Sequence, residues 1–173
     1  MAYLLDANVF IQAKNLQYGF DFCPAFWDWL VMKHAAGSIF SIRQVGEELR
    51  TGEDDLADWA HSRGEAFFLP PDNAVVAAAA TVSAWVAGQK YEPVAVNTFL
   101  QVADYWLVAF ALAAGHTVVT HEVPANSARK IKVPNVCVGL GVRFVTPYQM
   151  LRLERARFVL APPVPPVVVA PLI

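Results

Sequence analysis

The sequence has little charge and no excess of either sign. Charged residues make up 16% of the 173 residues, hydrophobic residues make up 56%, and the formal net charge is −2. Such a chain carries no overall positive field that would draw it to nucleic acid or to an anionic membrane. Any affinity for nucleic acid therefore has to come from a local patch or from a bound cation.

Long apolar runs are also missing. No run reaches the ~18 residues that a bilayer-spanning helix needs. No basic segment precedes the first apolar run, as it would in a signal peptide. We therefore expect neither a membrane span nor a signal peptide.

Cysteine is scarce, and the glycine-rich loop of nucleotide-binding folds is absent. Cys23 and Cys137 are the only two cysteines and do not have the spacing of metal ligands. We expect them to be reduced core thiols of a cytoplasmic protein. Because no glycine-rich loop follows the first apolar run, a Rossmann-type nucleotide-binding protein is disfavoured.

Apolar runs of strand length alternate with helical patterns along residues 1–158. This order favours an α/β fold with a mainly parallel sheet of four or five strands and helices on both faces. We expect one domain there, followed by a Pro/Val-rich extended tail over 159–173. The expected strands are 3–5, 38–42, 66–69, 117–120 and 142–145, and the longer expected helices are 22–36, 43–50, 74–87, 99–114 and 147–157.

The first apolar run ends in a carboxylate. Tyr3 to Leu5 is typical of a strand buried on both faces, and Asp6 follows it directly. A charge at the end of a buried strand is costly unless it is compensated, and open parallel sheets bind ligands at the carboxyl ends of their strands. Asp6 is therefore either a metal or substrate ligand or the N-cap of the next helix, a place that Asn8 also suits.

Two adjacent glutamates differ in the direction that a helix gives them. Each helical residue turns by about 100°, so Glu48 lies about 60° from Val45, at the edge of the face that Val45 and Leu49 mark as buried. Glu47 lies about 160° from Val45 and faces solvent. Glu48 is therefore the better candidate for a site.

A third carboxylate, Asp104, stands on an apolar helix face. Leu107 and Ala111 share its side of the expected helix 99–114. Asn97 lies upstream and is a good cap, so we expect Asp104 in the helix interior. A buried carboxylate there needs an arginine, a network of donors or a metal as its partner, and we favour a metal.

A fourth carboxylate, Glu122, follows the expected strand 117–120 by two residues. Taken alone, it reads more simply as a loop residue. Four carboxylates without nearby cysteines or paired histidines form a hard-oxygen site, which suits Mg²⁺ or Mn²⁺ better than zinc. Their mutual repulsion also argues for a bound cation. The predicted metal ligands and catalytic residues are Asp6, Glu48, Asp104 and Glu122.

These four places together resemble the PIN-domain nucleases. The pattern of that family is an aspartate ending the first strand, a glutamate on an early helix, an aspartate heading an apolar helix turn and an acidic residue after the fourth strand. The matching segments here are Leu5-Asp6-Ala7-Asn8-Val9, Val45-Gly46-Glu47-Glu48-Leu49, Ala103-Asp104-Tyr105-Trp106-Leu107 and Thr120-His121-Glu122. The last departs from the pattern, in which aspartate is usual.

The resemblance is to a PIN-like subgroup of largely unassigned function, related to the ribonuclease toxins of bacterial toxin–antitoxin pairs. It implies a three-layer α/β/α sandwich, Mg²⁺- or Mn²⁺-dependent RNA cleavage, a homodimer and an antitoxin protein that blocks the site. Asn8 and Thr120 are expected to orient a metal-binding carboxylate or a water by hydrogen bonds, without contacting the metal themselves. Arg129, Lys130 and Lys132 form a basic cluster that either holds the RNA backbone or is a solvated loop.

Two other functions stay open at this point. The chain could be a catalytically silent PIN-like interaction module whose carboxylates are satisfied by lysine or arginine. It could also be another carboxylate-metal phosphohydrolase, although such enzymes often have an aspartate at the position of Asn8. A gain in thermal stability with Mn²⁺ would separate a working metal site from a silent one.

Overall fold

A five-stranded parallel sheet forms the centre of the computed structural model, which describes residues 2–159. Its strand order is β3-β2-β1-β4-β5, and every neighbouring pair is parallel. The strands are β1 Tyr3–Leu5, β2 Ile39–Ile42, β3 Phe68–Leu69, β4 Thr117–Val119 and β5 Phe144–Val145. The predicted α/β sandwich with a parallel sheet is confirmed. Except for Val159, the predicted tail lies outside the described residues.

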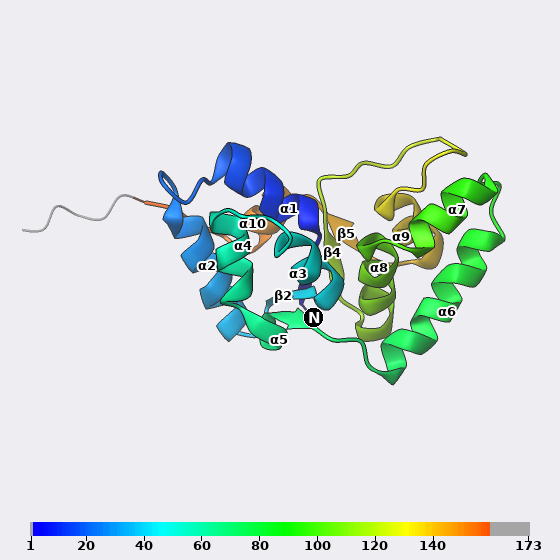
Figure 1. Ribbon diagram of the computed structural model, residues 1–173, viewed down its shortest axis with the longest axis horizontal. Helices are drawn as coiled ribbons and strands as arrows, with labels where there is room; N and C mark the ends of the chain where they lie inside the picture. Colours follow the sequence, from blue (N-terminus) through cyan, green and yellow to red (C-terminus); the bar gives the residue numbers. More distant parts are fainter. Residues whose placement is uncertain (1, 160–173) are drawn as a thin grey trace, which may run out of the picture.

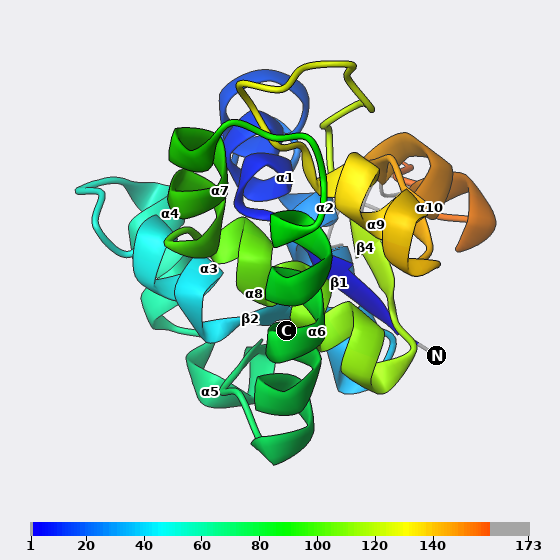
Figure 2. The same cartoon turned by 90° about the vertical axis from the view of Figure 1, so that its right-hand side faces the viewer.

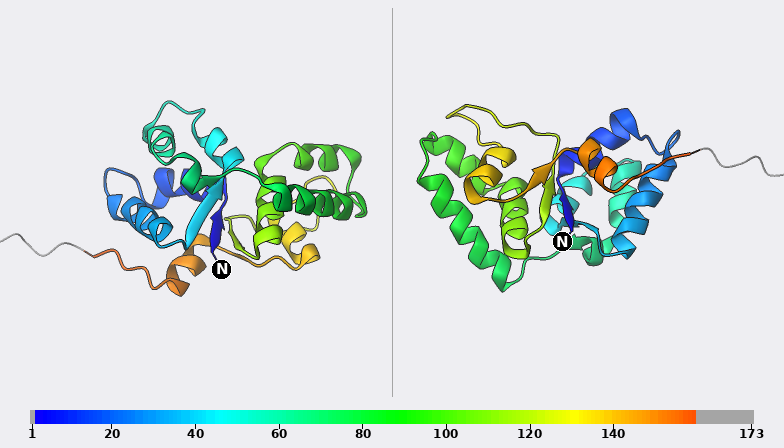
Figure 3. Two further views of the ribbon diagram at one scale, coloured as in Figure 1. Left: turned by 90° about the horizontal axis from the view of Figure 1, so that it is seen from below. Right: turned by 180° about the vertical axis from the view of Figure 1, so that it is seen from behind.

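The helices account for most of the rest of the chain. They are α1 Ala7–Gln12, η1 Ala13–Gln17 (a π-helix), α2 Pro24–Ala35, α3 Arg43–Leu49, α4 Asp55–His61, α5 Gly64–Phe67, α6 Asn73–Ala87, α7 Pro93–Leu100, α8 Ala103–Ala114, α9 Val133–Leu140 and α10 Pro147–Leu153. Helix α8 packs against β2 and β4, with α6 and α9 outside it, whereas α2 packs on β2 from the other side of the sheet (Figures 1 and 3).

Apolar runs explain why the sheet is covered on both faces. Leu4, Leu5, Val118 and Val119 in the two central strands are fully buried. Strands that are buried on both faces read as continuous apolar segments, and this is the pattern that the sequence shows. Two free cysteines belong to the same interior, Cys137 buried and Cys23 half-buried.

The chain changes direction across the sheet between β1 and β4. From β1 it runs outward through β2 to β3, and it then returns to place β4 on the other side of β1. Leu5 pairs with Val119, so Asp6 and Thr120 leave the sheet at the same level. Such a switch point is where open parallel sheets bind ligands.

Several predicted elements have different bounds in the structure; the expected strand 142–145, for example, is limited to Phe144–Val145. Residues 66–67 belong to α5, so the third strand is limited to Phe68–Leu69. Helix α9 was not among the expected helices. Pro134 lies in the first turn of α9, where proline is accepted because no N–H is needed.

The expected helix 99–114 is two helices. Helix α7 starts earlier, at Pro93, and ends at Leu100, and α8 begins at Ala103 after a bend of 69°. Neither glycine nor proline marks the break, so the apolar pattern alone did not show it. No single helix within residues 2–159 is long and apolar enough to cross a bilayer; α7 and α8 meet that test only when they are taken together.

We predict that Gly46→Ala destabilises the fold by about 1–3 kcal/mol, because overpacking of a filled core has a cost of this size. An added Cβ would lie 2.7 Å from Cγ of Phe68, a ring that is 1% exposed. Urea unfolding measures the effect. Glu47→Ala, on the exposed side of the same helix, is the control and should change the free energy of unfolding by less than about 0.5 kcal/mol. Equal stability of the two variants would contradict the packing described.

Candidate functional site

A network of side-chain hydrogen bonds joins the carboxyl ends of β1 and β4. Oδ2 of Asp6 accepts a hydrogen bond from Oγ1 of Thr120 at 2.7 Å and from Nδ2 of Asn8 at 2.5 Å. The backbone N–H of His121 donates to Oδ1 of Asn8, and that of Glu122 donates to Oγ1 of Thr120, each at 3.0 Å. Asn8 and Thr120 therefore fix the Asp6 carboxylate, which is the arrangement expected of groups behind a ligand.

Asp6 itself is buried, with 3% of its surface exposed. Burial, together with the charges of Glu122 and Glu48, raises its pKa to about 6. The hydrogen bonds from Thr120 and from the backbone of Ala7 act in the opposite direction. As an N-cap, Asp6 makes no side-chain hydrogen bond of the capping type, so capping does not explain its presence.

The sequence predicts Asp104 in a helix interior, but the residue lies in the first turn of α8. The side chain is half-buried. Within residues 2–159, its carboxylate accepts no hydrogen bond and forms no ion pair. Burial raises its pKa to about 7, and the charges of Asp6, Glu122 and Glu48 contribute in the same direction.

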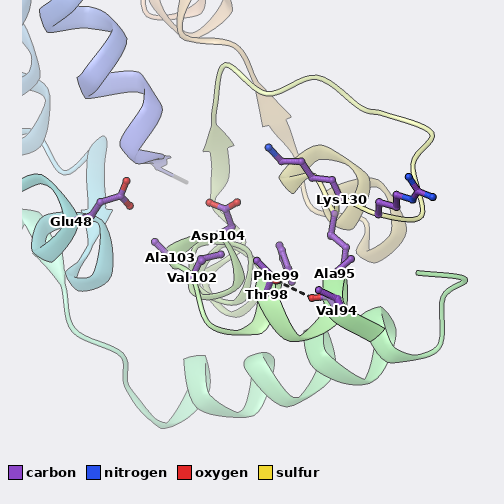
Figure 4. A pocket seen from close by; sticks show the side chains of 11 residues that line it. Glu48, Val94, Ala95, Thr98, Phe99, Val102, Ala103, Asp104 and Lys130 are labelled. Carbon is purple, nitrogen blue, oxygen red and sulfur yellow. Dashed lines mark hydrogen bonds between the residues drawn. The ribbon is translucent and has the colours of Figure 1, made fainter. Parts of the chain in front are cut away.

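Glu48 lies at the edge of this acidic centre. Val45 and Leu49 are buried on α3 as predicted, while Glu47 and Glu48 are exposed residues. Partial burial raises the pKa of Glu48, and its charge reaches both Asp6 and Asp104. Figure 4 shows the Glu48 and Asp104 carboxylates on neighbouring helices, both at the same hollow.

Glu122 is in a different state from the other three carboxylates. Its Oε1 forms an ion pair with Nζ of Lys132, and its Oε2 accepts a hydrogen bond from the backbone N–H of Val133 at 2.9 Å. Both side chains are largely shielded, with 17% of Glu122 and 23% of Lys132 exposed. The hydrogen bond to Glu122 raises the pKa of Lys132. Glu122 thus belongs to the centre but has its charge compensated.

A hollow of about 560 Å³ adjoins the carboxylates. Val94, Ala95, Phe99 and Val102 supply apolar walls, and Lys130 reaches over it from the segment between β4 and α9 (Figure 4). That segment arches over the carboxyl end of the sheet next to α7 (Figure 2). The sequence did not indicate this hollow, since it forms only where α7 and α8 bend apart.

The three basic residues predicted for RNA have different surroundings. Lys132 is paired with Glu122, and Arg129 forms an ion pair with Glu92 at 3.2 Å. Both residues of the second pair are largely exposed, so this contact is weak. Lys130 has no ion pair among the described residues and lines the hollow together with Asp104.

The charges of Glu48 and Glu122 thus act on both Asp6 and Asp104 at the carboxyl end of the sheet. No three Asp, Glu, His or Cys side chains within residues 2–159 are arranged closely enough to hold a metal ion as they stand. The donor chemistry nevertheless fits a hard divalent cation, since the groups are oxygens only and three of them form no ion pair within residues 2–159. Asp6, Glu48 and Asp104 are the residues that would hold it.

We predict that Asp104→Asn stabilises the metal-free protein at pH 8 by several degrees in melting temperature. In the unfolded chain this carboxyl ionises near 3.8, and in the folded protein near 7. The folded state therefore binds more protons between these values, and its stability falls as the pH rises through this window. Asparagine, which cannot ionise, removes that loss.

Thermal melts of both proteins in chelator between pH 4 and pH 8 measure this difference. The two curves should meet near pH 4 and separate above it. Asp28→Asn, which removes an exposed carboxylate on α2, is the control and should follow the wild type. A constant offset between wild type and Asp104→Asn at every pH would refute the assignment of a buried, uncompensated charge.

Comparison with known proteins gives a family without an assigned activity. Residues 3–158 match the family model described as "Domain of unknown function (DUF4411)". Searches of curated proteins and of solved structures found no match. The match covers nearly all of the chain that the structure describes, and the chain therefore belongs to the DUF4411 family.

Proposed function

We propose that the chain is a metal-dependent endoribonuclease that hydrolyses phosphodiester bonds in RNA with Mg²⁺ or Mn²⁺. The observation that carries the proposal is the group of three carboxylates, Asp6, Glu48 and Asp104, without a basic partner at the switch point of a parallel sheet. Buried charges of one sign are unfavourable. Carboxylates whose pKa values are raised and that adjoin a hollow are candidates for a functional site.

The chain's own residues have distinct parts in this reaction. Asn8 and Thr120 hold the Asp6 carboxylate in one orientation. Asp104 and Glu48 face the hollow, where the substrate would lie. When bound, a divalent ion supplies the activation of water and the stabilisation of charge on the phosphate.

The hollow favours a nucleotide polymer over a small phosphate ester. Its apolar walls suit a base, and Lys130 suits a backbone phosphate next to the one at the carboxylates. The resemblance to PIN-domain nucleases adds RNA as the substrate and extends the proposal to a cytoplasmic toxin that works as a homodimer and is blocked by an antitoxin protein.

A silent PIN-like interaction module is the second candidate. The Lys132–Glu122 ion pair and the lack of a ready-made ligand group within residues 2–159 favour it. A different phosphohydrolase is less favoured, because Asn8, at the position where such enzymes often carry an acid, is engaged through both its amide nitrogen and its amide oxygen.

We predict Mn²⁺-dependent cleavage of RNA by the wild type and a loss on the order of 100-fold or more in Asp6→Asn and Asp104→Asn, because each removes a charge that would hold the ion. Gel analysis of a labelled RNA, with and without chelator, measures it. Asp28→Asn should cleave as the wild type does. Equal cleavage rates in all four proteins would refute the assigned site, whereas no cleavage together with no Mn²⁺-dependent gain in melting temperature would favour the silent module.

We predict that Val102→Trp weakens RNA binding roughly fivefold or more, a loss of about 1 kcal/mol. Val102 is 41% exposed and lines the hollow, so an indole ring there takes the space proposed for the RNA. Fluorescence anisotropy of a labelled single-stranded RNA in chelator measures binding without cleavage. Val76→Trp on α6, at a residue that is 54% exposed, is the matched control. Unchanged affinity in Val102→Trp would place the RNA elsewhere.

A further inference from the structure

Both carboxylate oxygens of Glu122 already accept hydrogen bonds from other groups of the protein. One carboxylate oxygen is paired with the ammonium of Lys132 and the other with the backbone N–H of Val133. To bind a metal ion, Glu122 would have to give up a shielded ion pair and leave a backbone donor at the start of α9 without its partner. Breaking a shielded pair on one side carries the cost of the charge left behind.

Lys132 is held in place as well. It is the N-cap residue of α9, so its backbone is fixed by the start of that helix. Its positive charge reaches Asp104, whose pKa it lowers. A fixed cation therefore stands within the acidic centre, on the side where β4 leads into the segment before α9.

We infer that Lys132 acts as a built-in counter-cation that withdraws Glu122 from metal binding, so that the centre takes one divalent ion, held by Asp6, Glu48 and Asp104. This inference rests on the proposed function and specifies its metal site. Two-metal sites hold their ions about 3.5–4 Å apart between shared ligands. Here a second ion would meet the ammonium of Lys132, and two divalent ions would bring four positive charges to three uncompensated carboxylates.

Lys132 is thus a positioning residue, and its removal should increase metal binding. In Lys132→Met the carboxylate of Glu122 loses its counter-charge and becomes available as a further ligand. We expect Mn²⁺ to bind at least tenfold more tightly, or with a second ion per chain. In the double variant Lys132→Met, Glu122→Gln the pair is replaced by neutral groups of similar shape, and binding should return to one ion with an affinity near that of the wild type.

Isothermal titration with Mn²⁺, together with electron paramagnetic resonance of the free ion, gives the stoichiometry and the affinity without any substrate. The wild type should bind one ion. Lys90→Met, which removes an exposed lysine, should match it, and Lys132→Arg, which keeps the charge, should also bind one. Circular dichroism melts show whether each variant is folded. If Lys132→Met does not fold, the double variant decides, since a Glu122 ligand would make its Mn²⁺ affinity fall well below that of the wild type.

Two ions in the wild type, or a Lys132→Met protein that is folded and binds Mn²⁺ as the wild type does, would overturn this inference. Either result leaves the proposed nuclease intact if Mn²⁺-dependent cleavage is present. Failure of the proposed function has a different signature: no Mn²⁺ binds to the wild type, and no RNA is cleaved.

Discussion

The cost of keeping an ionised carboxylate out of water at the end of the central strand shapes this fold. Asp6 is buried at the point where β1 leaves the sheet, and the chain surrounds it with donors from β4 and from the first turn of α1. Those donors offset only part of the desolvation, because its pKa is still raised. The remaining cost gives the site its attraction for positive charge.

Much of the architecture could be predicted from local patterns. Continuous apolar runs identified the strands, and their alternation with helices indicated a parallel sheet. The direction of a side chain on a helix separated Glu48 from Glu47, because one turn of α3 fixes both relative to Val45. Asp6 could be proposed as a site residue because a charge directly after a buried strand is unfavourable unless another group compensates it.

Two features that the sequence did not show depend on packing and on side-chain contacts outside any regular pattern. The break between α7 and α8 carries no glycine or proline, so only tertiary packing reveals it. The pairing of Lys132 with Glu122 spans 10 residues of an irregular segment, where no periodicity fixes the direction of a side chain. The sequence thus suggested which carboxylates to consider. It did not show which of them forms an ion pair, because that depends on side-chain contacts that no local pattern determines.

The hydrogen bond between Asp6 and Thr120 joins residues 114 positions apart in the chain. During synthesis the first strand leaves the ribosome long before its partner exists, and loop closure over such a distance comes late in folding. Until the chain has been made past β4, Asp6 has the nearby donor Asn8 but lacks the hydrogen bond from Thr120. A nascent chain that ends before β4 therefore has an incomplete hydrogen-bond network around Asp6, and this network is completed only once translation has passed β4.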